Sequence, residues 1–199
     1  MIPEILKLFP ETIFKYKFEN FENFNQELKK YIYELQKKDK HGLTKSNQGG
    51  WHSPEFSLKE PNSIQNKFAL ALHKYIVNTF QNLGWKIENK NIRIMEMWAI
   101  INKKKDFNIT HTHPNSFLSA AYYVQASKNC GKFKVKNPNT TKEYYYPEIN
   151  EHNELNAMTA GLDIMEGDLL IFPGYLPHSV TENKSDKDRI VISFNIDID

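Results

Sequence analysis

The chain has 199 residues, 40% of them hydrophobic, which predicts a single globular domain over residues 1–199. The 26 Lys and Arg side chains nearly balance the 24 Asp and Glu side chains, and the resulting net charge of +2 argues against a nucleic-acid-binding protein. The single cysteine, Cys130, excludes an intrachain disulfide, and no apolar run approaches the roughly 20 residues that span a membrane. With no signal-peptide pattern in the first ten residues, we expect a cytoplasmic protein.

Residues 1–90 are expected to form mainly helices that support the rest of the domain, with one loop between them. Apolar residues recur three and four positions apart over residues 21–35, which predicts an amphipathic helix with one buried stripe. A second helix is predicted over residues 63–83, where Ser63 can cap the start and Gly84 suits the C-terminal stop. We interpret both apolar stripes as parts of the core.

The loop between these helices contains residues 46–54 (SNQGGWHSP), in which two glycines precede a large aromatic side chain. Consecutive glycines allow backbone conformations that other residues avoid, so Trp51 could act as a lid or stacking surface over a pocket. An ordinary turn in which Trp51 fills the edge of the core explains the segment equally well. His52 is a less favoured candidate for a metal ligand.

Residues 91–199 have the pattern of a β-rich core. Residues 92–101 are apolar on both alternations, as expected of a strand that is covered on both faces. Short strands, separated by turn signals and without alternating helices, predict a mainly β fold with supporting helices (α+β), arranged as a sandwich or jelly roll. The other predicted strands cover residues 119–124, 131–135, 168–172 and 190–196.

Three histidines are the candidate metal ligands. His111 and His113 are two residues apart, so their side chains would point to the same face of an extended strand. His178 follows a distant predicted strand and could complete a site of three imidazoles around one mononuclear metal ion. Imidazole binds iron, zinc, copper and nickel, so these ligands do not by themselves select the metal.

Arg189, just before the last predicted strand, favours iron over the other metals. An arginine at this place, one loop away from His178, is suited to hold a dicarboxylate through a bidentate pair. The alternative is an ordinary ion pair of Arg189 with Asp186 or Asp188.

Three segments together resemble the 2-oxoglutarate and Fe(II)-dependent oxygenases, and the loop at residues 46–53 fits the same pattern. Within that superfamily the chain is most similar to prolyl-hydroxylase-like oxygenases that are common in marine bacteria and their phages. The resemblance implies a double-stranded β-helix, a cupin-like variant of the jelly roll, with Fe(II), 2-oxoglutarate and O2 as cofactors and co-substrates. The segments are residues 108–123 (NITHTHPNSFLSAAYY), 167–178 (GDLLIFPGYLPH) and 189–195 (RIVISFN).

The same resemblance implies roles for individual residues. His111 and His178 match the two histidines that bind Fe(II), and Arg189 matches the basic residue that grips the far carboxylate of 2-oxoglutarate. Tyr122 is expected to face the opposite side of its strand. The remaining matches to the co-substrate site are Tyr123, Ser193 and Asn195.

His113 departs from the family pattern, in which a carboxylate occupies this position. Its presence removes one anionic ligand and makes the expected iron site more positive. Three interpretations stay open: a working three-histidine site, a site completed by water or a remote carboxylate, and a non-catalytic relic. Halogenase chemistry is not expected, since it needs a small residue here.

The implied reaction couples decarboxylation of 2-oxoglutarate, with release of succinate and CO2, to hydroxylation of a small-molecule or peptide substrate that the sequence does not identify. Trp51, Trp98 and the tyrosines at residues 144–146 are candidates for positioning that substrate and excluding water. A cupin-like Zn or Ni metalloprotein and a non-catalytic binding module on the same fold are the alternatives. We expect no nucleic-acid or membrane partner, and a homodimer is possible.

Overall fold

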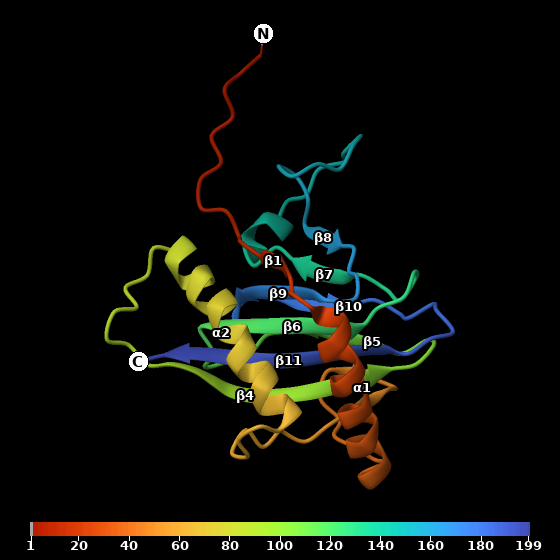
Figure 1. The fold of residues 1–199 in the computed structure, drawn as a ribbon. Helices are drawn as coiled ribbons and strands as arrows, with labels where there is room; N and C mark the ends of the chain where they lie inside the picture. The colour runs from red at the N-terminus through yellow and green to blue at the C-terminus, as the bar shows by residue number, and fades with distance from the viewer. Residues whose placement is uncertain (1) are drawn as a thin grey trace.

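Two antiparallel β-sheets form the centre of the molecule in a computed structural model that describes residues 2–199 (Figure 1). The larger sheet has the order β1 (Phe14–Lys17), β9 (Asp168–Pro173), β6 (Leu118–Gln125), β11 (Arg189–Ile198), β4 (Ile92–Asn102) and β3 (Trp51–His52). The smaller sheet has the order β2 (Asn47–Gln48), β5 (Phe107–His111), β10 (His178–Val180), β7 (Phe133–Lys136) and β8 (Thr159–Leu162).

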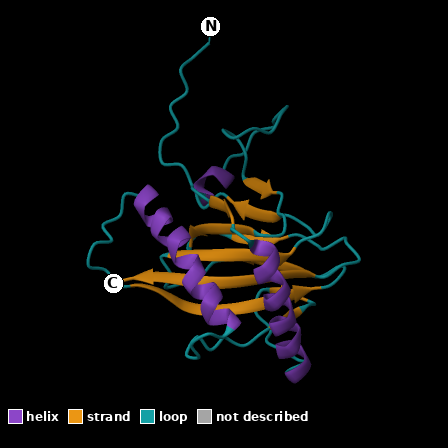
Figure 2. Ribbon diagram, in the orientation of Figure 1, coloured by secondary structure: helices purple, strands orange, loops and turns teal. Residues whose placement is uncertain are grey.

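Two helices cover the face of the larger sheet that lies away from the smaller one, as Figures 1 and 2 show for α1 (Phe21–Lys38) and α2 (Ile64–Asn82). The backbone N–H of Asn66 donates to the Ser63 side chain and so caps α2, while Gly84 adopts a left-handed φ of 69° after its end. Both helices were expected from the sequence, and their buried stripes pack on the sheet. No helix within residues 2–199 combines the length and apolarity needed to cross a membrane.

The alternation of side chains along β11 separates two environments. Residues at even positions, such as Ile192 and Phe194, pack in the core beneath the helices, whereas Val191 belongs to a second core between the sheets. This explains why the long central strands read as continuous apolar runs, since both of their faces are covered. The predicted strands of residues 92–101, 119–124, 168–172 and 190–196 are confirmed within two residues at each end.

Most of the short strands were not expected from the sequence. β1, β2, β3, β8 and β10 have two to four residues each, which is too short for a periodic pattern to show. The extended strand expected for His111 and His113 is β5, but it ends at His111, so the placement of His113 on the strand was wrong. The third predicted strand begins at Phe133 and not at Gly131, because Gly131 has a φ of 96° that no strand residue adopts. A short 3-10 helix, η1 (Thr140–Glu143), follows β7.

Candidate active site

A cavity of about 620 Å³ lies between the two sheets. Its wall on the larger sheet is formed by alternate residues of the adjacent strands β4 and β11. These residues are paired in register, so they lie side by side and point into the cavity together. The opposing wall includes residues of β5 and β10. From the closed end to the open end, the paired residues are Arg189 and Asn102, Val191 and Ile100, Ser193 and Trp98, and Asn195 and Glu96.

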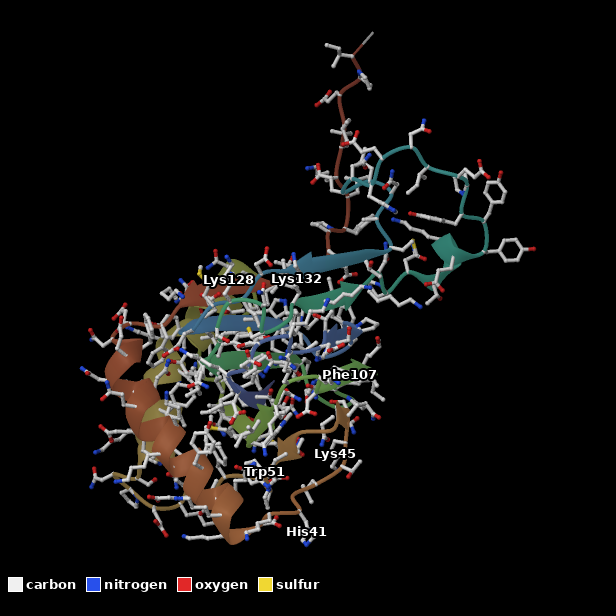
Figure 3. All side chains as sticks on the ribbon, turned by 90° about the vertical axis from the view of Figure 1, so that its right-hand side faces the viewer. His41, Lys45, Trp51, Phe107, Lys128 and Lys132 are labelled. Atoms are coloured by element: carbon white, nitrogen blue, oxygen red, sulfur yellow. The ribbon has the colours of Figure 1, made fainter. Side chains whose placement is uncertain are left out.

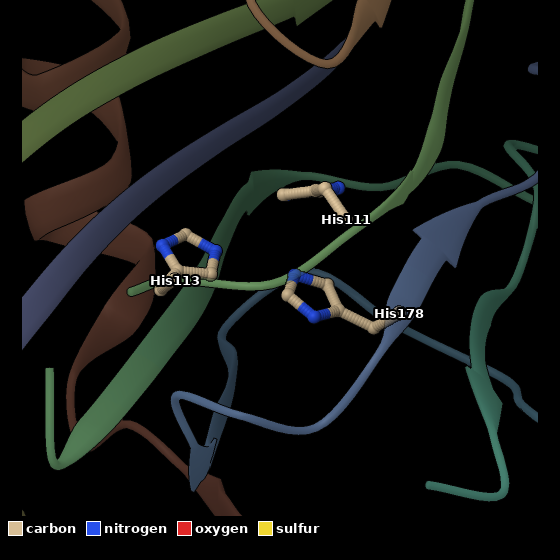
Figure 4. Close-up of side chains that lie close together, drawn as sticks. All are labelled: His111, His113 and His178. Atoms are coloured by element: carbon tan, nitrogen blue, oxygen red, sulfur yellow. The ribbon is translucent and has the colours of Figure 1, made fainter. Parts of the chain in front are cut away.

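His111, His113 and His178 line this cavity, and their side chains lie close together (Figure 4). His111 ends β5 and is the direct pairing partner of His178, the first residue of β10. His113 lies just beyond the strand, where its backbone N–H donates to the carbonyl oxygen of Gly174 at 2.8 Å. One nitrogen from each ring lies within 4.8 Å of the others, so the three side chains can hold one metal ion.

Backbone hydrogen bonds orient two of the rings. The Nδ1 atom of His111 lies 2.8 Å from the carbonyl oxygen of Ile109, and Nδ1 of His178 lies 2.9 Å from that of Leu176. A carbonyl oxygen only accepts, so Nδ1 carries the proton in both rings and Nε2 keeps a free lone pair. This arrangement is the one by which proteins commonly orient metal-binding histidines.

Burial keeps the three rings neutral in the absence of metal. The pKa of His178 is lowered to about 3 and that of His113 to about 4; burial is the largest cause of both shifts, and the charge of a protonated His111 contributes to both. Burial also lowers the pKa of His111. Near pH 7 the fold therefore presents three neutral imidazoles, the form that binds metal.

We expect the metal-free chain to lose stability as the pH falls below 6.5. The unfolded chain then takes up protons at ordinary histidine pKa values, while the folded chain resists them until the pH nears 4 to 3, so protonation favours unfolding. Urea unfolding midpoints in chelator at pH 7.5, 6 and 5 measure this loss. The unfolding midpoint of the His178→Asn variant is expected to depend less steeply on pH. An identical pH dependence in the variant and the parent would contradict the attribution of this loss to the buried histidines.

Arg189 is fully buried at the closed end of the cavity, and only part of its guanidinium is satisfied. One terminal nitrogen donates to the carbonyl oxygens of Cys130 and Thr181, whereas Nε and the other terminal nitrogen have no hydrogen-bond partner within residues 2–199. The alternative of an ion pair with Asp186 or Asp188 is wrong. Those carboxylates instead contact Lys104 and the Tyr33 hydroxyl, respectively, each at 2.7 Å.

Two further buried polar groups beside Arg189 also lack hydrogen-bond partners in the described part of the chain. The Tyr123 hydroxyl lines the cavity next to Arg189, and the side-chain nitrogen of Asn102 lies on the paired position of β4. Buried donors without acceptors are rare, so these groups mark a place for an anion with several oxygen atoms. Tyr122 faces the opposite side, as expected, and its hydroxyl donates to Asn25 at 2.6 Å. Asn102 was missed by sequence reasoning, since only the strand register places it beside Arg189.

Gly131 allows the close approach that positions Arg189. A Cβ atom at residue 131 would lie 2.6 Å from the bound guanidinium nitrogen and would also collide with the Thr181 carbonyl oxygen. We therefore expect Gly131→Ala to displace Arg189 and to weaken 2-oxoglutarate binding by about tenfold or more, with metal binding retained. Calorimetric titration of the Co(II)-loaded variant tests this, with Gly84→Ala as the control because Gly84 has the same left-handed backbone but open space around it. Equal affinity in all three proteins would remove this role.

Ser193 and Asn195 lie farther along the same strand face. Ser193 pairs with Trp98 in the middle of the cavity. Asn195 lies six residues from Arg189, where its side-chain oxygen accepts from Ser119 at 3.0 Å and its nitrogen donates to Glu96 at 2.7 Å. The Asn195 side chain is also close enough to His113 to raise the pKa of that ring, against the larger effect of burial. This places Asn195 at the metal end of the cavity.

The aromatic candidates from the sequence have different locations. Trp51 is 3% exposed, belongs to the helix-side core and donates from Nε1 to the carbonyl oxygen of Asp39 at 2.7 Å, so the lid interpretation is wrong and the core-edge interpretation is right. Trp98 does line the cavity, stacked near His52 and His113. His52 itself lies outside the three-histidine group within residues 2–199.

The tyrosine run does not reach the cavity. Tyr144 and Tyr145 are 94% and 81% exposed, and the teal segment that follows β7 extends away from the body of the molecule in Figure 3. These side chains are absent from the residues that line the cavity. A role in excluding water from the site is therefore not supported for them.

The two sheets form a double-stranded β-helix, whose cavity brings together three histidines that could hold one metal ion and buried donors that are free to bind an anion. A family model described as "Putative 2OG-Fe(II) oxygenase" matches residues 96–195, which is half of the chain. The chain belongs to this family of 2-oxoglutarate and Fe(II)-dependent oxygenases. Fe(II) and 2-oxoglutarate are accordingly its cofactor and co-substrate, and the three histidines and the unpartnered donors at Arg189 fit them.

Solved structures share the fold at low sequence identity, whereas curated proteins give no match. A prolyl-4-hydroxylase from Pseudomonas putida is 11% identical with a TM-score of 0.65, covering 93% of this chain and 92% of its own. HygX from Streptomyces hygroscopicus, with nickel and 2-oxoglutarate bound, is 10% identical with a TM-score of 0.65 and coverages of 94% and 82%. A Trichoplax adhaerens prolyl hydroxylase, in complex with a peptide fragment of the hypoxia inducible factor oxygen degradation domain, is 12% identical with a TM-score of 0.62 and coverages of 92% and 82%.

Proposed function

We propose that this oxygenase hydroxylates a C–H bond of a small-molecule or peptide substrate, with Fe(II) bound by His111, His113 and His178 and 2-oxoglutarate bound by Arg189. The balanced reaction consumes the substrate, 2-oxoglutarate and O2 and yields the hydroxylated product, succinate and CO2. The observation that carries the proposal is the pair of unpartnered guanidinium nitrogens, fully buried in the same cavity as three converging histidines. A Zn or Ni hydrolase has no use for such a dicarboxylate site.

Different residues of the chain would bind the co-substrate and hold the metal ligands in place. Arg189 would bind the far carboxylate through Nε and its free terminal nitrogen, with hydrogen bonds from Tyr123 and Asn102 to the same group. The bound iron supplies the redox chemistry that activates O2. The rings of Phe133 and Phe172 pack on His178 with centroids 5.2 and 4.6 Å apart, which restrains the ligand and limits water at its side of the site.

Turnover without added substrate tests the proposed reaction. The chain supplied with Fe(II), 2-oxoglutarate and O2 is expected to form succinate slowly, because oxygenases of this kind can decarboxylate the co-substrate in the absence of the main substrate. Replacing Fe(II) with Zn(II) is expected to stop succinate formation. Succinate at the level of the enzyme-free control, in protein that retains Fe(II) and 2-oxoglutarate, would contradict an oxidative function.

His113→Asp tests whether the departure from the family pattern is a true metal ligand. The variant restores two histidines and one carboxylate, so we expect it to bind Fe(II) at least as tightly as the parent, since an anionic ligand replaces a neutral one. Its rate of succinate formation without substrate is expected to change. The His113→Asn variant has the same shape without the charge and serves as the control.

A packing role for His113 predicts a different result. Aspartate would then be buried without a metal partner and destabilise the fold by about 1 to 3 kcal/mol, with no change in iron affinity. A lowered melting temperature together with unaltered iron affinity would remove His113 from the site.

A further inference from the structure

The cavity has a second charged end, opposite Arg189. The paired strands β11 and β4 bring Arg189 beside Asn102 at one end and Asn195 beside Glu96 at the other. The two ends are six residues apart along β11, a distance of about 20 Å at roughly 3.3 Å per residue. The ring of His113 lies 5.8 Å from that of Trp98, which precedes Glu96 on the way to the open end. The metal site is therefore nearer to Glu96 than to Arg189 along this wall.

The carboxylate of Glu96 is held in place although its side chain is exposed. Asn195 donates to Glu96 Oε2 at 2.7 Å, and the other end of the Asn195 amide is fixed by Ser119 at 3.0 Å. Asn195 and Ser119 are 6% and 1% exposed, so the support is rigid and largely dry. Glu96 forms no ion pair within residues 2–199, and the arginine on its own strand, Arg93, pairs with Asp197 and Asp199.

An apolar wall adjoins this carboxylate. Trp98 lines the cavity two residues from Glu96 on the same strand face, and its ring is stacked near His52 and His113 at centroid distances of 5.7 and 5.8 Å. Ile100 continues the wall toward the closed end. A ligand bound here would contact the carboxylate with one group and the indole with an apolar body.

The other charges at the opening are not fixed in this way. Glu55 and Lys45 also line the cavity, but within residues 2–199 neither side chain takes part in a hydrogen bond or ion pair. Exposed charges without a fixed geometry contribute little to binding, whereas a carboxylate already held by Asn195 loses little freedom when it binds a cation. The cavity thus has a fixed cationic group at its closed end and a fixed anionic group at its opening.

We propose that the main substrate carries an amine or guanidinium group, which Glu96 binds, on an apolar body that lies against Trp98 beside the metal site. The proposal rests on the proposed function, because it assigns the substrate class of that same site. The opposite charges at the two ends also direct each ligand to its own site. The dianionic co-substrate is attracted to Arg189 and repelled by Glu96, whereas the cationic substrate is attracted to Glu96 and repelled by Arg189.

The test is a binding measurement with simple probes. n-Butylammonium, with n-butanol and butyrate as neutral and anionic probes of the same length, is titrated at constant ionic strength into protein loaded with Zn(II) and 2-oxoglutarate. The chain has three tryptophans, and the indole N–H NMR signal of Trp98 reports on the cavity while that of buried Trp51 is an internal reference. We expect butylammonium alone to shift the Trp98 signal in a saturable way.

Two matched variants locate the binding group. Glu96→Gln keeps an oxygen for the Asn195 hydrogen bond and removes the charge, so we expect it to fold normally and to weaken butylammonium binding about fivefold or more. Glu55→Gln removes the unfixed carboxylate at the same opening, and we expect less than about a twofold change. Equal binding of butylammonium by Glu96→Gln and parent, or equal shifts by the three probes, would overturn the proposal.

Repeating the titration on metal-free protein separates this inference from the proposed function. Butylammonium binding that depends on Glu96, in a chain that takes up neither metal nor 2-oxoglutarate, would contradict the proposed function and leave the cation site standing. Normal uptake of metal and 2-oxoglutarate, with no Glu96-dependent binding of the probe, would overturn the cation site alone.

Discussion

Replacing His178 with alanine is expected to abolish metal binding while leaving the fold largely intact. His178 is the most buried of the three histidines, and its Nδ1 hydrogen bond directs Nε2 toward the other two rings. Loss of a residue that merely orients a metal ligand typically costs 10- to 100-fold in affinity, so loss of a ligand is expected to cost more than about 100-fold. Equilibrium dialysis with Fe(II) under anaerobic conditions measures the change.

His73→Ala is the matched control for that experiment. His73 lies exposed on α2, on the other side of the larger sheet from the cavity, so its loss removes one imidazole without touching the site. We expect unchanged Fe(II) binding in this control and a cooperative thermal transition in both variants, because the two cores are built from other residues. Unchanged metal content in folded His178→Ala protein would place the metal elsewhere.

Replacing Arg189 with leucine is expected to weaken 2-oxoglutarate binding at least tenfold and to spare Fe(II). Truncating one partner of a buried charge pair costs on the order of 2 to 5 kcal/mol, much of it from the carboxylate left unpaired. The same change also removes the hydrogen bonds to the Cys130 and Thr181 carbonyls, so some loss of stability is expected. Calorimetric titration of Co(II)-loaded protein at 10 °C gives the affinity while the variant stays folded.

Two further variants keep this result interpretable. Arg189→Lys retains the charge but lacks the forked pair of donors, and we expect it to bind 2-oxoglutarate more weakly than the parent even if it is stable. Arg93→Leu is the same substitution at the other arginine of the chain, where the side chain is half-exposed and pairs with Asp197 and Asp199. Parent-like affinity in both Arg189 variants would rule out the proposed role.

The fold class could be predicted because its strongest signals are long and local. The apolar stripes of α1 and α2 and the apolar runs of β4, β6, β9 and β11 span six or more residues each, which is long enough for the pattern to be recognised. The smaller sheet could not be predicted in the same way. β2, β5 and β10 are held by pairing with strands distant in sequence, such as His178 with His111, and their own residues carry too few positions to show a period.

Some residues of the candidate site could likewise be predicted from the sequence, and others could not. The histidines and Arg189 could be named from the sequence, because their types and order resemble a known family and their chemistry is distinctive. Asn102 and Glu96 could not, since their relevance depends on the register that sets β4 against β11. Trp51 was ambiguous because a tryptophan after two glycines suits both a lid and a plug, and only its burial and its hydrogen bond to Asp39 decide between them.

The most direct test of the account is anaerobic titration of 2-oxoglutarate into Fe(II)-loaded protein, followed by visible absorption. Chelation of Fe(II) by the keto acid of 2-oxoglutarate produces a weak charge-transfer band, and we expect this band to appear, to saturate at one equivalent, and to require both His178 and Arg189 at micromolar co-substrate. No band in protein shown to contain Fe(II) and 2-oxoglutarate, or a band unaffected by His178→Ala and Arg189→Leu, would contradict the placement of metal and co-substrate in this cavity.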